Sequence, residues 1–80
     1  MKLTILAPES ELFSGEVIKV RVPACGGAFE ILENHAPIIS LLNPGTIRIV
    51  EAPKKQTKIE IKGGIVECAG NNVYVLAKPL

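Results

Sequence analysis

The sequence has no aspartate and no tryptophan, and it holds a single histidine, a single tyrosine and two cysteines. Without aspartate it lacks the commonest third member of a catalytic triad and a usual ligand of Mg²⁺ and Ca²⁺. The two cysteines, Cys25 and Cys68, are separated by forty-two residues and neither belongs to a Cys-x-x-Cys pair, so no zinc site is indicated. These shortages predict a chain that binds no metal and no cofactor.

The charge balance and the N-terminus exclude two further classes of partner. Nine Lys and Arg against eight Glu leave a net charge of +1, which does not suggest nucleic acid. The first apolar residues, Leu3 to Ala7, form a run too short for a signal peptide or a membrane span. We therefore expect no direct membrane insertion, and reduced thiols. A disulfide between Cys25 and Cys68 is the alternative.

The apolar residues that are present favour β-structure. Ile and Val number seventeen, against three aromatic residues, and β-branched side chains prefer strands. Apolar positions alternate and are interrupted by Gly, Pro or Asn at short intervals, which is typical of an all-β sandwich or barrel. A chain of 80 residues has room for one modest core. We predict a single domain over residues 1–80, with eight to ten short strands and no second domain.

The alternation also places the strands and their inner faces. Ile18, Val20 and Val22 are expected on one core-facing side, and Ile38 to Leu42 is apolar enough to be buried on both faces. Gly63-Gly64 predicts a bulge or bend between two strands. The inward residues of one hairpin would be Ile47, Ile49, Ile59 and Ile61. The predicted strands are 2–7, 12–13, 16–22, 28–32, 38–42, 46–51, 57–62, 65–68 and 73–77.

His35 is the obvious candidate for chemistry, in the irregular stretch from Gly26 to Leu42. A histidine acts as base or ligand only with companions, and pairing with either cysteine would lack a residue to orient the ring. The Asn34-His35-Ala36-Pro37 turn needs side chains that hydrogen-bond its exposed backbone. We therefore predict a structural or interface role for His35.

Other small motifs have simple structural interpretations. Gly26-Gly27 lacks a following Gly-Lys-Ser/Thr and a helix, so it predicts a tight turn between strands rather than a phosphate loop. Lys54 and Lys55 form the solvated tip of a hairpin that protects an edge strand. Taken alone, the residues indicate a small β-sandwich binding module.

The order of the motifs carries more information than any one of them. The chain reads Pro8-Glu9, Phe13-Ser14-Gly15-Glu16-Val17, Gly27-x-Phe29-x-Ile31-Leu32-x-x-His35-Ala36-Pro37, Pro44-Gly45-x-x-Arg48-Ile49, Gly63-Gly64-Ile65-Val66-Glu67 and Asn72-Val73-x-Val75-Leu76-Ala77. This series resembles the N-terminal β-sandwich domain of the epsilon subunit of F-type ATP synthase, named delta in mitochondria. The resemblance covers essentially the whole chain.

The resemblance implies a flattened, mostly antiparallel sandwich of ten strands and a non-catalytic place in the rotor. Family members bind the gamma subunit and the polar loops of the membrane c-ring, and so couple ion flow to rotation. ATP is made in the alpha/beta hexamer, which this subunit contacts indirectly. The location implied is peripheral, on the cytoplasmic face of the inner membrane.

The resemblance also suggests two sets of contact residues, with Phe29 and Ile38 as anchors. Phe29→Ala or His35→Ala is expected to weaken assembly. The residues expected to contact gamma are Ala7, Pro8, His35, Ala36, Pro37, Ile38 and Ser40. Those expected to contact the c-ring are Ala24, Cys25, Gly26, Gly27, Ala28, Phe29 and Glu30.

The sequence departs from the family pattern at three places. Glu33-Asn34 stands where the family usually has Pro-Gly, and Ala28 stands where it often has an acidic residue, with Glu30 as a substitute. The helical hairpin that commonly follows the sandwich is not in this sequence, so we expect coupling without inhibition of ATP hydrolysis by that route. The alternatives are a stand-alone β-sandwich adaptor or ligand-binding module, and a Cys/His hydrolase.

Overall fold

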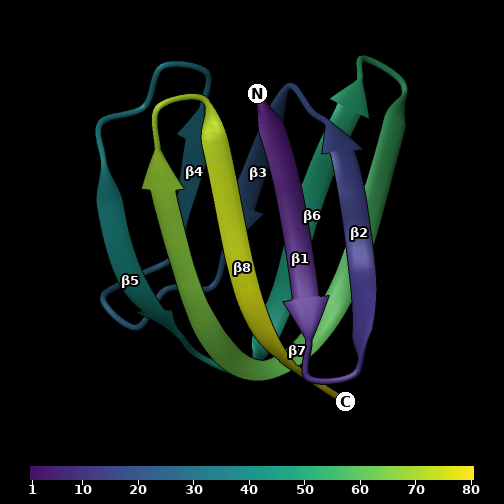
Figure 1. The fold of residues 1–80 in the computed structure, drawn as a ribbon, viewed down its shortest axis with the longest axis vertical. Helices are drawn as coiled ribbons and strands as arrows, with labels where there is room; N and C mark the ends of the chain where they lie inside the picture. The colour runs from purple at the N-terminus through teal and green to yellow at the C-terminus, as the bar shows by residue number, and fades with distance from the viewer.

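The computed structural model describes all 80 residues, as eight strands and no helix, and confirms the all-β prediction (Figure 1). None of its elements is a helix that could cross a membrane. The strands are β1 (Lys2–Ala7), β2 (Ser10–Glu16), β3 (Lys19–Val22), β4 (Phe29–Leu32), β5 (Ile38–Leu42), β6 (Gly45–Ala52), β7 (Lys55–Ala69) and β8 (Asn72–Pro79).

The strands form one hydrogen-bonded sheet that folds over itself into two layers. The order is β2-β1-β8-β7-β6-β3-β4, and β5 pairs with β7 beside this path. The first half of β7 pairs with β6 and its second half with β5 and β8, so β7 belongs to both layers (Figure 1). Only the β1–β8 pair is parallel, as expected for a mostly antiparallel sandwich.

Gly63 and Gly64 lie where β7 passes between the layers. Their φ angles are 145° and 154°, and the register against β8 shifts between Ile61 and Gly63. The predicted bulge is therefore confirmed. The predicted break between strands 57–62 and 65–68 is wrong, because residues without Cβ adopt these backbone angles while the strand continues.

The second and third strands begin and end elsewhere than predicted. β2 starts at Ser10 rather than Leu12, because the polar residues Ser10 and Glu11 pair with β1. The predicted strand 16–22 begins only at Lys19. Ile18 is 45% exposed, so its prediction as a core residue is wrong. Val17 is buried instead, since the chain turns here to bond the backbone of Met1 and Val50.

The core lies between the two layers and contains 17 buried apolar residues. Ile47, Ile49 and Ile61 are buried as predicted, and Ile59 is half-buried against the core. The prediction that β5 is buried on both faces is wrong. Ile39 and Leu41 are 66% and 63% exposed, because β5 pairs only with β7 and no element covers its outer face.

Candidate interaction surfaces

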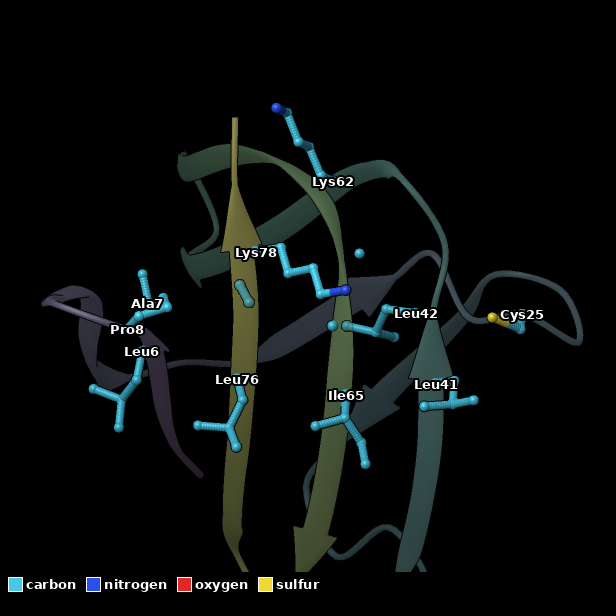
Figure 2. A pocket seen from close by; sticks show the side chains of 13 residues that line it. Leu6, Ala7, Pro8, Cys25, Leu41, Leu42, Lys62, Ile65, Leu76 and Lys78 are labelled. Carbon is cyan, nitrogen blue, oxygen red and sulfur yellow. The ribbon is translucent and has the colours of Figure 1, made fainter.

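The layer made by β5, β7, β8 and β1 carries a line of apolar side chains on its outer face (Figure 2). Leu41 lies opposite Ile65, Ile65 opposite Leu76, and Leu76 opposite Leu6 in the strand registers. Leu41, Leu76 and Leu6 are 63%, 57% and 38% exposed, and Ile65 is half-buried. We call these four residues the apolar row. Exposed apolar surface that runs over several strands marks an interaction site more often than a free surface.

A hollow of about 750 Å³ lies alongside the apolar row, and all four members of the row line it (Figure 2). Its rim includes Ala7 at the end of β1, Pro8 in the β1–β2 turn and Cys25 in the β3–β4 loop. Lys62 and Lys78 add two cations. The arrangement combines an apolar floor with a charged rim, which is the usual anatomy of a protein–protein contact.

The apolar row was not identified from the sequence. Its signal was present, because Ile65-Val66 and Val75-Leu76-Ala77 are continuous apolar runs in strands that otherwise alternate. Such runs indicate a strand covered on both faces. Val66 and Val75 are buried in the core, while Leu76 and Ile65 face outward and would be covered only by another molecule.

The residues predicted to contact gamma lie at two opposite ends of the sheet. Ala7 ends β1 and Pro8 follows it at one end, whereas residues 35–37 precede β5 at the other (Figure 1). Ile38 and Ser40 are half-buried, since in β5 the outward positions are Ile39 and Leu41. The apolar row includes none of the residues predicted to contact gamma, but it lies beside two of them, Ala7 and Pro8.

The loop around His35 is held by hydrogen bonds of its own. The ring Nδ1 donates to the Ala36 carbonyl oxygen at 2.7 Å, and the backbone N–H of His35 donates to the carbonyl of Leu32. The Asn34 N–H donates to Oδ1 of Asn71, in the turn between β7 and β8. The His35 ring also stacks on Phe29, with ring centroids 6.3 Å apart. The His35 side chain thus makes the hydrogen bond to the turn backbone that the sequence led us to expect, and its contact with gamma stays a prediction.

The residues predicted to contact the c-ring occupy the β3–β4 connection and the start of β4. The N–H of Gly27 donates to the carbonyl of Ala24, which confirms the tight turn, and Ala24 is buried. Residues 25–28 are exposed, whereas Phe29 is half-buried and packs against the core. Phe29 thus contacts His35 from the other predicted set, whereas Cys25 and Pro8 lie at opposite sides of the hollow (Figure 2).

The thiols are not arranged for nucleophilic chemistry. The Cys25 thiol donates to Oδ1 of Asn43 at 3.2 Å, and the His35 ring bonds backbone rather than sulfur. Cys68 is buried, and this burial raises the pKa of its thiol. A nucleophile needs the opposite shift, so the hydrolase alternative has no support in this geometry. Both cysteines are free, and no group of three potential metal ligands is formed.

Comparison with known families decides between the remaining alternatives. Residues 1–79 match the model of the β-sandwich domain of the ATP synthase delta/epsilon chain. The chain belongs to this family. The resemblance deduced from the order of motifs is thereby confirmed.

Individual epsilon chains of the family differ in how far they extend beyond the sandwich. The chain is 36% identical over 77 residues to the ATP synthase epsilon chain of Chlorobium limicola, covering 96% of this chain and 88% of that one. It is 40% identical over 73 residues to that of Rhodopseudomonas palustris strain BisA53, covering 91% of this chain and 53% of that one. It therefore spans about half the length of the second relative.

Solved structures share the fold at low sequence identity. A chain in the Euglena gracilis mitochondrial ATP synthase (OSCP/F1/c-ring) superposes with a TM-score of 0.87 at 19% identity, covering 94% of this chain and 48% of that one. A chain in the Tetrahymena thermophila mitochondrial ATP synthase (central stalk and c-ring) gives 0.80 at 17% identity, covering 96% and 62%.

The departure at Glu33-Asn34 has a local explanation. Asn34 has φ at +63°, a left-handed conformation that asparagine tolerates better than most residues, so it can stand where the resemblance led us to expect glycine. The Glu33 carboxylate lies 3.8 Å from the ammonium group of Met1. This variant of the epsilon loop is thus held to the start of β1 as well as to Asn71.

Proposed function

We propose that the chain is a central-stalk subunit of an F-type ATP synthase, linking gamma to the c-ring and so coupling ion translocation to ATP synthesis. The observation that carries the proposal is the family match over residues 1–79. The subunit acts by contact, at the cytoplasmic face of the inner membrane, and bond chemistry takes place in the alpha/beta hexamer. It works as a rigid sandwich that transmits torque between two partners.

The gamma contact is proposed on the outer face of the β5-β7-β8-β1 layer. The apolar row supplies its centre, and Ala7 and Pro8 border it at the hollow. Residues 35–37 extend the contact to the opposite end, next to Ile38. Burying a few large apolar anchors supplies most of the affinity of such an interface.

The ring contact is proposed at the β3–β4 loop. The exposed backbone of residues 25–28 has no side chain beyond Cys25 and Ala28, so polar loops of a partner can approach it closely. Glu30 supplies the acidic group nearby, although it is already paired with Lys19 at 3.4 Å. Phe29 joins this site to His35 and hence to the gamma side.

The proposal is tested by binding of the purified chain to a gamma–c-ring subcomplex. Leu41→Ser with Leu76→Ser is expected to weaken binding at least about tenfold, because each removes an exposed apolar anchor. Leu32→Ser is the matched control, since Leu32 is 50% exposed on the other layer. Thermal unfolding of each variant establishes that the fold persists.

Two outcomes would contradict the assignment. Unchanged binding of the Leu41/Leu76 variant would exclude the apolar row as the gamma contact. Failure of the unaltered chain to bind any synthase subcomplex would exclude the rotor function itself. Phe29→Ala and His35→Ala, tested in the same assay, are each expected to weaken assembly.

A further inference from the structure

The layer formed by β4, β3, β6 and the first half of β7 carries a line of cations on its outer face. Arg21 lies opposite Arg48, and Arg48 lies opposite Lys58, on three neighbouring strands. All three side chains are exposed. We call Arg21, Arg48 and Lys58 the cationic row. In Figure 1, β3, β4 and β6 lie behind β8 and β1, so this face is turned away from the apolar row.

No member of the cationic row forms an ion pair. Like charges directly opposite each other on paired strands are destabilising. The chain's ion pairs involve Met1, Lys19 and Lys55, and none involves a member of the row. Glu30, opposite Arg21, is the one carboxylate in line with the row, and its partner is Lys19.

Other polar side chains on the same face do find partners. The Thr46 hydroxyl donates to the Glu60 carboxylate from the opposite strand, and Lys19 pairs with Glu30. The unpaired line of cations is therefore a local exception on this face. A ligand carrying negative charge would relieve the repulsion within it.

A shallow hollow of about 190 Å³ lies beside the row and can seat part of a ligand. Lys19, Arg21 and Arg48 line it against the single carboxylate of Glu30, which leaves it positively charged, and Gln56 adds an amide that can donate or accept a hydrogen bond. A single guanidinium group can bind a carboxylate through two parallel hydrogen bonds. The chemistry of the hollow thus fits carboxylate oxygens.

We infer that the cationic row binds an acidic helical segment of a protein. Adjacent strands lie about 4.8 Å apart, so the cations repeat at about that interval across the sheet. Carboxylates at i and i+4 on one helix face repeat at about 5–6 Å, whereas in an extended segment the same-face spacing is about 6.6 Å. A helix lying across the strands therefore matches the row.

An anionic membrane fits the face less well. Glu30 continues the line of the row beyond Arg21, and Glu60 stands two residues from Lys58 in β7. A broad anionic surface would meet these carboxylates and be repelled by them. A helix is narrow enough to contact the row and leave them in water. The inference does not depend on the proposed gamma and ring contacts, with which it shares only Glu30.

The test is titration of the ¹⁵N-labelled chain at low ionic strength with a blocked peptide that has Glu at every fourth position. Its matched probe has Gln at those positions. We expect shifts in the amide resonances of the cationic row with the Glu peptide only. Arg21→Gln with Arg48→Gln should weaken binding at least about tenfold, because two charge-assisted contacts are lost.

The control variant is Lys2→Gln with Lys54→Gln, which lowers the net charge equally but lies outside the row. It should bind the Glu peptide as the unaltered chain does. If the control variant bound the Glu peptide as weakly as the Arg21/Arg48 variant, the effect would depend on net charge alone and the inference would be wrong.

Two other results would also overturn the inference. Stronger binding to phosphatidylglycerol vesicles would mean that the ligand of the row is a membrane, and saturation of the same residues by inorganic phosphate would mean that it is a small anion. An unchanged or raised Tm of the Arg21/Arg48 variant shows that unfolding is not the cause of its weakened binding.

Discussion

At the scale of single residues, the two cysteines show how position alone sets thiol behaviour. Cys25 is exposed on a loop, whereas Cys68 is 2% exposed in β7 and its pKa is raised by burial. At about pH 8 we expect a thiol reagent to modify Cys25 in the native chain and Cys68 only after unfolding. Mass spectrometry of protease fragments measures this. Rapid native modification of Cys68 would contradict its burial.

The same shift predicts a pH dependence of stability. The folded pKa of Cys68 lies above its unfolded value, so the stability gained by burying the neutral thiol is fully present below the unfolded value. It is lost as the pH rises through the window between the two values. The free energies of unfolding of the unaltered chain and of Cys68→Ala, measured in urea, should therefore converge in this alkaline range. A constant difference between them would refute the linkage.

At the scale of elements, β7 depends on the glycine at its bend. A Cβ on Gly64 would collide with the carbonyl oxygen of Leu76 and come within 3.1 Å of the Ala77 Cα, and its φ is +154°. We expect Gly64→Ala to lower the free energy of unfolding by at least about 2 kcal/mol. Denaturant unfolding measures this change.

Gly26→Ala is the control for the β7 substitution. A Cβ there meets nothing within 4 Å, so its effect should stay within about 0.5 kcal/mol. Equal costs at Gly26 and Gly64 would mean that loss of glycine flexibility, rather than the close approach to β8, determines the effect.

At the scale of the whole molecule, the C-terminal strand β8 joins β1 and β2 to the rest of the sheet. It lies between β1 and β7, and β1 has no other link to the sheet except β2. A chain ending at Gly70 would lose buried Val73 and Val75, worth about 1.5–3 kcal/mol each, and would detach β1 and β2. Net stability for this size is roughly 4–12 kcal/mol.

We therefore expect the chain ending at Gly70 to show no cooperative unfolding transition by circular dichroism. The chain that lacks only Leu80, which is 75% exposed, should unfold as the full chain does. A cooperative transition in the shorter chain would show that β3 to β7 fold independently.

Local chemistry was sufficient to predict most of the fold. Alternating Ile and Val indicated strands, the Gly63-Gly64 pair indicated the bulge, and the Gly26-Gly27 pair indicated the turn, because each depends on neighbours in the chain. The errors of prediction lie where pairing between residues far apart in the chain determines the structure. Ile18 is exposed because Val17 bonds Met1, and the glycine pair leaves β7 unbroken because β8 pairs along it.

The candidate surfaces were predicted less completely. His35 was identified with its structural role, and the family was identified from the order of the motifs. The apolar row and the cationic row were missed. Alternation determines which residues of one strand share a face, and that much the sequence by itself establishes. Which strands become neighbours, and which face is left uncovered, depends on contacts between residues far apart in the chain. Only the tertiary structure could therefore place Leu6 beside Leu76, or Arg21 beside Arg48.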